Sequence, residues 1–186
     1  MSVKSFKVSF NLDEKDVDYF RKLFRLARNN ASSAEPQEII TSAIDLVRTV
    51  RSKKNTPRFI VEAVDAIEDL TEIILDADYR ATKPIRNQIL GALAYFANPE
   101  DLIPDEIPVL GFLDDAIMIK FVEEEFKHEL WAYRKFRKFR DGAEQRPWTQ
   151  VAGSRLPSRL STMRKKLRDD VTARKAKDEA KGRIGF

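Results

Sequence analysis

The chain of 186 residues is long enough for one domain with a substantial core and too short for two domains of full size. It contains no cysteine, which excludes disulfides, thiolate zinc sites and cysteine nucleophiles, and its single histidine, His128, excludes a multi-histidine metal site within one chain. The net charge of +4 hides a split, because residues 141–186 hold 12 Lys/Arg against 6 Asp/Glu, whereas residues 1–140 are slightly acidic. We expect no signal peptide and no membrane span, and therefore a cytoplasmic protein, with a peripheral position at the inner membrane left open.

Residues 1–55 are expected to form a strand and two helices. Polar and apolar side chains alternate over residues 4–12, which predicts a short β-strand with one apolar face. Asp13 is placed to cap a first helix, and Pro36 falls in the first turn of a second. This order resembles the ribbon-helix-helix pattern of dimeric DNA-binding proteins, in which side chains such as Lys7, Ser9 and Asn11 would read the major groove. The alternative is a strand that pairs with its twin in a homodimer, or packs on the helices, without contacting DNA.

Residues 56–141 are expected to form three further helices. The third helix begins near Thr56, a predicted cap, and carries acidic residues that we interpret as a solvated surface: Glu62, Asp65, Glu68, Asp69 and Glu72. The fourth helix starts near Thr82 and stops before Pro99, and the fifth runs without a break from about residue 112 to Arg140.

Scattered Pro, Gly and Ser over residues 142–186 predict a mobile, basic and largely irregular C-terminal tail. The predicted fold is mainly α, with about five helices around one core, a short N-terminal β-strand, a Pro-rich turn between two helices, and this tail.

The Pro-rich turn is the most specific stretch of the sequence. Three prolines fix φ and make it rigid, and its apolar side chains predict contact with the helices or with a protein partner. The predicted partner-binding residues are Leu102, Ile103, Pro104, Ile107 and Pro108.

The pattern from Tyr95 to Asp115 (Tyr-Phe-x-x-Pro-x-Asp-Leu-Ile-Pro-Asp-x-Ile-Pro-x-Leu-Gly-x-Leu-Asp-Asp) resembles the signature of the YkvA-like family, a small bacterial and plastid domain of unknown function. The resemblance covers roughly residues 85–120. It implies a helical hairpin and brings no established activity.

Four aspartates in and after the turn raise a question of chemistry: Asp101, Asp105, Asp114 and Asp115. Our first interpretation is that they cap turns and the start of the fifth helix. The alternative is a hard-cation site, in which these carboxylates hold Mg²⁺, Mn²⁺ or Ca²⁺. Otherwise we expect no cofactor.

A second candidate surface lies near the end of the fifth helix, where cations alternate with aromatic rings. Its residues are Trp131, Arg134, Lys135, Arg137, Lys138 and Arg140. Such a run could contact anionic lipid or nucleic acid, whereas the alternative is cations that complement the negative end of the helix, with rings that continue a buried stripe.

We favour a non-enzymatic class, because the sequence offers no nucleophile motif and no phosphate-binding or dinucleotide-binding loop. The preferred function is an interaction or scaffold protein that presents the rigid turn to an unknown protein partner, with peripheral membrane contact left open. A metal-dependent enzyme and a DNA-binding dimer are the alternatives.

Overall fold

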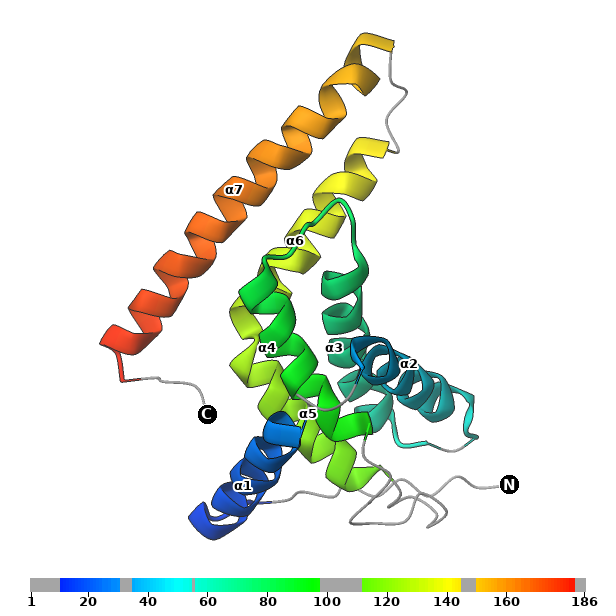
Figure 1. The fold of residues 1–186 in the computed structure, drawn as a ribbon, viewed down its shortest axis with the longest axis vertical. Helices are drawn as coiled ribbons and strands as arrows, with labels where there is room; N and C mark the ends of the chain where they lie inside the picture. Colours follow the sequence, from blue (N-terminus) through cyan, green and yellow to red (C-terminus); the bar gives the residue numbers. More distant parts are fainter. Residues whose placement is uncertain (1–10, 31–34, 55, 98–111, 145–149, 183–186) are drawn as a thin grey trace, which may run out of the picture.

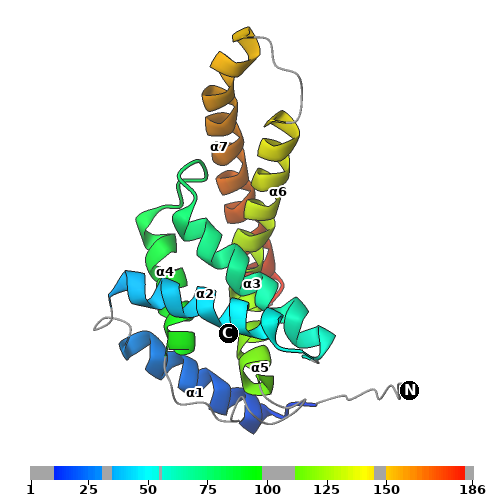
Figure 2. The ribbon, with the colours of Figure 1, turned by 90° about the vertical axis from the view of Figure 1, so that its right-hand side faces the viewer.

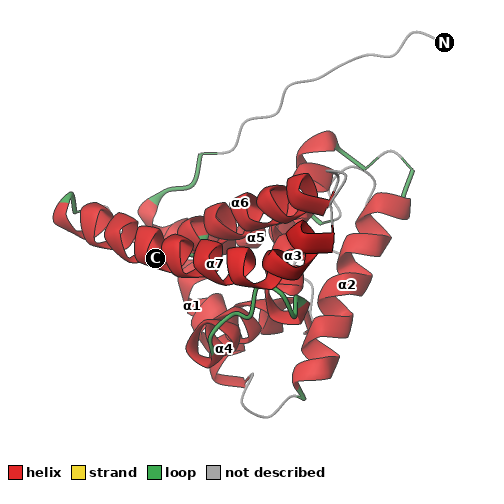
Figure 3. Ribbon diagram, turned by 90° about the horizontal axis from the view of Figure 1, so that it is seen from above, coloured by secondary structure: helices red, strands yellow, loops and turns green. Residues whose placement is uncertain are grey.

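The structure is a computed structural model that describes residues 11–30, 35–54, 56–97, 112–144 and 150–182. Over these ranges the chain forms seven α-helices and one short 3-10 helix, without a strand (Figures 1 and 3). The mainly α class is confirmed, but the expected number of helices is wrong. The predicted strand falls mostly on residues 1–10 and the Pro-rich turn on residues 98–111, so both lie outside the described residues.

Local chemistry sets the starts of helices α1 (Glu14–Asn30) and α2 (Pro36–Ser52). The Asp13 carboxylate accepts the backbone N–H groups of Lys15 and Asp16 at 2.8 and 2.9 Å. In return, the Asp16 carboxylate accepts the N–H of Asp13 at 3.0 Å. Pro36 occupies the first turn of α2, where its missing N–H leaves no helical bond unmade. The predicted cap at Asp13 is therefore confirmed.

Helix α3 (Arg58–Leu75) lies at the centre of the molecule and packs against α2, α4, α5 and α6 (Figure 2). Its inner face is fully buried and consists of Ile60, Val64, Ile67, Leu70 and Ile73. The predicted cap at Thr56 is wrong, because Pro57 holds the N-cap position. The Thr56 hydroxyl instead donates to the carbonyls of Val50 and Lys53 at 3.1 and 3.0 Å, where it closes the end of α2.

Helix α4 (Lys83–Leu93) continues into the 3-10 helix η2 (Ala94–Ala97), which leads to the Pro-rich residues. A Cβ atom added at Gly91 would lie 2.9 Å from Cγ of Arg28, so glycine allows α4 to approach α1 closely at this point. Arg28 also forms an ion pair with Glu125 at 2.9 Å. Together the two contacts fix α1 beside α4 and the C-terminal end of α5.

The predicted long fifth helix is two helices, α5 (Leu113–Glu125) and α6 (Lys127–Glu144). Phe126 separates them with φ −101° and ψ 16°, outside helical values, and its side chain is buried. The prediction of one uninterrupted helix was wrong because packing of an aromatic ring outweighs continuity of the helical pattern.

The predicted irregular tail is also wrong over most of its length, because helix α7 spans Gln150–Ala180. Figures 1 and 2 show α7 running antiparallel beside α6. The two helices share a small apolar cluster, separate from the main core, that contains Ala132, Phe136, Leu160 and Leu167. Helix α7 contributes Leu160 and Leu167 to this cluster, and its Leu156, Met163 and Val171 pack beside them, so a helix that is otherwise charged still buries one apolar face.

Candidate functional site

The aspartate cluster is only partly described. Asp114 and Asp115 lie in the first turn of α5, where a carboxylate is stabilised by the positive end of the helix. Asp114 is buried at 4% exposure, and Asp115 is half-buried. Asp101 and Asp105 lie outside the described residues, as do Leu102, Ile103, Pro104, Ile107 and Pro108 of the predicted partner surface. In the part of the chain that the structure describes, no three His, Cys, Asp or Glu side chains gather as metal ligands. The four-aspartate metal site therefore stays a prediction.

An apolar groove of about 310 Å³ lies where the chain enters α5. We call it the α5 groove, and its lining residues are Leu12, Phe59, Ala63, Leu113, Ala116, Ile117, Lys120 and Phe121. Phe59 and Leu12 are 47% and 40% exposed, an unusual degree for large apolar side chains that stand together. The groove thus offers an accessible apolar surface at the start of α5.

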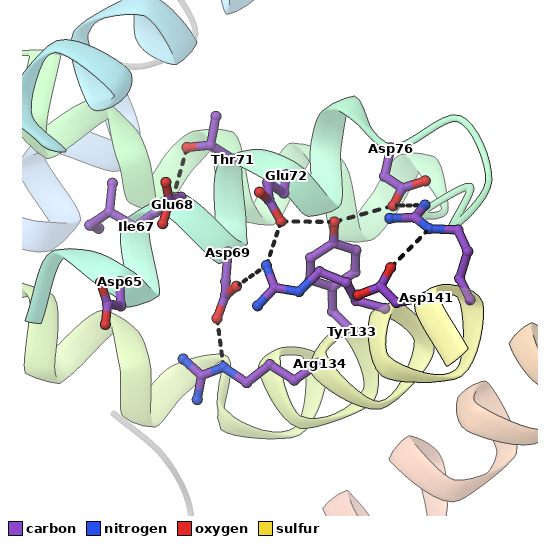
Figure 4. Close-up of polar contacts among 12 residues, drawn as sticks. Asp65, Ile67, Glu68, Asp69, Thr71, Glu72, Asp76, Tyr133, Arg134 and Asp141 are labelled. Carbon is purple, nitrogen blue, oxygen red and sulfur yellow. Dashed lines mark hydrogen bonds and ion pairs between the residues drawn. The ribbon is translucent and has the colours of Figure 1, made fainter. Parts of the chain in front are cut away.

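Acidic side chains of α3 face arginines of α6, as Figure 4 shows. Arg134 Nε lies 2.5 Å from Oδ2 of Asp69, and Arg137 Nη1 lies 3.1 Å from Asp69 Oδ1 and 2.8 Å from Glu72 Oε2. The interpretation of these acids as a solvated surface was therefore wrong for the buried Asp69, whereas Glu72 is paired with Arg137 but stays partly exposed. We call this contact, together with Asp76, Tyr133 and Arg140, the α3–α6 seam.

Tyr133 and Asp76 form the innermost part of the seam. The buried Tyr133 hydroxyl donates toward Glu72 Oε2 at 3.1 Å and Asp76 Oδ2 at 3.2 Å, and Arg140 Nη1 lies 2.7 Å from Asp76. Burial and the charges of Glu72 and Asp76 raise the pKa of Tyr133. Burial acts to raise the pKa of Asp76, but the backbone N–H of Tyr79 and the Arg140 guanidinium outweigh it and lower that pKa. The seam therefore holds a neutral phenol beside an ionised carboxylate.

Arg51 of α2 neutralises the acids at the other end of α3. Its guanidinium lies 2.6 Å from Glu68 and 2.8 Å from Asp65. The hydrogen bond from Arg51 lowers the pKa of Glu68. The acidic surface of α3 is thus largely balanced by arginines from two neighbouring helices.

A surface hollow of about 330 Å³ on α6 collects four of the six predicted lipid or nucleic-acid residues. We call it the Trp131 hollow, and its lining residues are Glu123, Lys127, Leu130, Trp131, Arg134, Lys135 and Lys138. Two cations lie over the indole ring, with Lys135 Nζ 4.8 Å and the Arg174 guanidinium 3.7 Å from its centroid. The other two predicted residues, Arg137 and Arg140, are engaged in the seam instead.

Helix α7 is held to the body by polar contacts as well as by its apolar cluster. Glu129, buried at 4% exposure, pairs with Lys175 at 2.5 Å. His128 Nε2 lies 3.1 Å from Asp178 Oδ2, which places the single histidine in a structural contact between α6 and α7. Arg164 also donates to the backbone carbonyl of Asp78 at 2.6 Å. Because α7 makes these contacts along much of its length, it is a packed part of the fold.

Among the described helices, none combines the length and the apolar composition needed to cross a bilayer. The candidate DNA-reading strand cannot be placed, because Lys7 and Ser9 lie outside the described residues. The DNA-binding dimer and the strand-mediated homodimer therefore stay predictions.

Residues 88–121 match a family described as a protein of unknown function (DUF1232). A segment of 49 residues is 41% identical to the "Uncharacterized membrane protein YkvA" of Bacillus subtilis (strain 168), which corresponds to 26% of this chain and 46% of that protein. The chain thus spans less than half the length of the relative it matches. No solved structure matches the chain significantly. The YkvA-like resemblance read from the turn is confirmed.

Sequence reasoning missed the α5 groove and the α3–α6 seam. The seam had a usable signal, because acids at positions 69, 72 and 76 and arginines at 134, 137 and 140 recur at matching helical spacing. The sequence signal for the groove was weaker. Phe59 lies outside the apolar stripe of its helix, so that stripe does not place it in the core.

Proposed function

Because residues 88–121 belong to the YkvA-like family, we propose that the protein is a non-enzymatic helical interaction protein whose α5 groove receives apolar side chains of a protein partner at a membrane surface. One observation carries this proposal above the others. The α5 groove takes five of its eight lining residues from the matched segment: Leu113, Ala116, Ile117, Lys120 and Phe121.

The shape and chemistry of the α5 groove suit an anchor residue. Its volume of about 310 Å³ has room for one or two large apolar side chains. Buried apolar anchors of this kind commonly supply most of the binding energy of an interface. Lys120 lies at the rim of the groove and is exposed, with its ammonium 2.6 Å from Oε2 of Glu123.

The predicted partner surface of the Pro-rich turn is continuous in sequence with this groove. Residues 98–111 follow η2 in the sequence and precede Phe112 and Leu113, both of which are buried. In our proposal the apolar side chains of the turn and the groove contact the same partner. The membrane location draws on the name of the Bacillus relative, which describes that protein as a membrane protein.

The proposal is tested by placing a photo-crosslinking residue at Phe59 of the full chain in living cells. Leu26 of α1 is the matched control position, because it is 49% exposed, close to the 47% of Phe59, and lies outside the groove. We expect a discrete protein adduct from position 59 that is absent from position 26. Ile117→Asp in the crosslinking variant should abolish that adduct. The same adducts from both positions, or an adduct that survives Ile117→Asp, would show that the groove is not the binding surface.

A further inference from the structure

We infer that the Trp131 hollow, together with Arg174 of α7, is a docking surface for the phosphate headgroups of an anionic bilayer. The inference rests on the membrane part of the proposed function and adds the face of the protein and the class of lipid. It is independent of the α5 groove, because none of the residues that line the hollow lines the groove.

Some cations of the hollow form ion pairs with carboxylates of the protein, and others do not. Arg134 is held by Asp69, and Lys127 lies 2.6 Å from Glu124. Lys135 and Lys138 are exposed and form no ion pair within the described ranges. These two lysines stand three residues apart on one face of α6 and are therefore available to phosphate groups.

The α3–α6 seam removes a repulsion that would oppose such docking. Asp69, Glu72 and Asp76 lie on the neighbouring helix, and each is paired with an arginine of α6. Without those pairs, the acids of α3 would weaken the positive potential beside the hollow. The seam therefore allows a body that is slightly acidic overall to present a basic surface on α6.

The aromatic floor of the hollow suits the boundary between water and lipid. Trp131 is half-buried, and tryptophan is enriched at the headgroup level of bilayers. Basic residues around an aromatic ring give the combination that holds peripheral proteins on anionic membranes. Each lysine near such a surface strengthens binding by about fivefold.

The same geometry argues against nucleic acid as the occupant. Binding of single strands relies on bases that stack on open aromatic faces. The Arg174 guanidinium lies 3.7 Å from the centroid of the Trp131 ring, so a base would have to displace it from that face. A phosphate group, in contrast, can approach Arg174 and Lys135 while both stay over the ring.

The test measures binding of the purified full chain to vesicles of phosphatidylcholine with and without 30% phosphatidylglycerol. Trp148→Phe leaves Trp131 as the single tryptophan, so a blue shift of its fluorescence, with quenching by brominated lipid, reports contact at the hollow itself. The test variant is Lys135→Gln/Lys138→Gln. The matched control is Lys22→Gln/Arg25→Gln, which removes the same charge at the same spacing from an exposed face of α1.

We expect binding to anionic vesicles only, a blue shift of Trp131, and affinity about 30-fold weaker in the hollow variant but unchanged in the control. Equal weakening of both variants would overturn the inference in favour of general charge attraction. Anionic binding that the hollow variant retains would assign the membrane contact to another face and leave the proposed function standing. No vesicle binding, or preference for an oligonucleotide over vesicles at equal ionic strength, would overturn both the inference and the membrane part of the proposed function, while the crosslinking result at Phe59 would be unaffected.

Discussion

Replacement of Tyr133 by phenylalanine tests whether the α3–α6 seam stabilises the fold. The ring is buried at 1% exposure and keeps its packing in the variant, so only the hydroxyl group is lost. That hydroxyl lies 3.1 and 3.2 Å from two carboxylates, but a single O–H donates fully to one acceptor at a time. The loss therefore corresponds to one hydrogen bond to a charged acceptor, which contributes about 1.5–3 kcal/mol.

The low end of that range applies, because both carboxylates keep another partner. Arg137 remains 2.8 Å from Glu72 and Arg140 remains 2.7 Å from Asp76, so no buried charge is left without a donor. We expect Tyr133→Phe to lower the free energy of unfolding by about 1.5 kcal/mol and the melting temperature by roughly 3–6 °C. Urea titration followed by circular dichroism measures the change, with an unaltered m-value as the check on two-state behaviour.

Tyr19→Phe is the matched control. Tyr19 is 48% exposed on α1, and its hydroxyl forms no hydrogen bond within the described residues, so we expect a change within about 0.5 kcal/mol. Suppose that Tyr133→Phe lowers the free energy of unfolding by no more than this control. The hydrogen bond of the Tyr133 hydroxyl in the native state would then be worth no more than the hydration of that hydroxyl in the unfolded chain. Our account of the seam would then be refuted.

Three further predictions concern pH and helix α7. Burial and the charge of Glu129 raise the pKa of Tyr79 to about 12. The neutral phenol therefore stabilises the fold below pH 10, and this contribution is lost as the pH rises from 10 toward 12. Tyr79→Phe should flatten the fall of the urea midpoint between pH 10 and 12, and an unchanged fall would contradict the assignment. Leu167→Ala should cost about 2–3 kcal/mol and, by hydrogen exchange, loosen α7 while α3 stays protected; equal loosening of both would mean that α7 and the core unfold together. Lys175→Met should cost about 3 kcal/mol by leaving the buried Glu129 carboxylate without its cation, and Glu129→Gln in that background should restore part of the loss in thermal unfolding; no restoration would mean that the lysine acts through packing.

Local chemistry in the sequence was sufficient to predict the starts of α1 and α2. A carboxylate before a helix, a proline in its first turn and apolar residues at helical spacing act within a few residues of one another. The break between α5 and α6 was harder to predict. Phe126, at which α5 ends, is buried, and its burial depends on neighbours distant in sequence.

Contacts over long sequence separation decided most of what the sequence did not reveal. The acids of α3 look the same whether they face water or arginines sixty residues away, so their composition indicated a solvated surface. In the same way, Leu160 and Leu167 of α7 stand among so many charged residues that they did not predict docking, because their apolar neighbours lie on α6. At the aspartate cluster, the sequence placed Asp114 and Asp115 correctly at a helix start, which is a local property.

The break at Phe126 sets the rotational phase of everything that follows it. An α-helix turns by about 100° per residue, and helical hydrogen bonds continue across Phe126, from its N–H to the carbonyl of Val122 at 3.0 Å and from the N–H of Leu130 to its carbonyl at 2.9 Å, so the direction of the α6 side chains stays tied to the packing of α5. Helix α5 turns Met118 and Ile119 into the core, while α6 turns Tyr133 toward α3 and Phe136 toward α7. Loss of one residue at this point would rotate α6 by about a quarter of a turn and carry its arginines away from Asp69, Glu72 and Asp76 as a group. One buried phenylalanine thus sets the angular offset between the part of the chain shared with the YkvA-like family and the basic face that follows it.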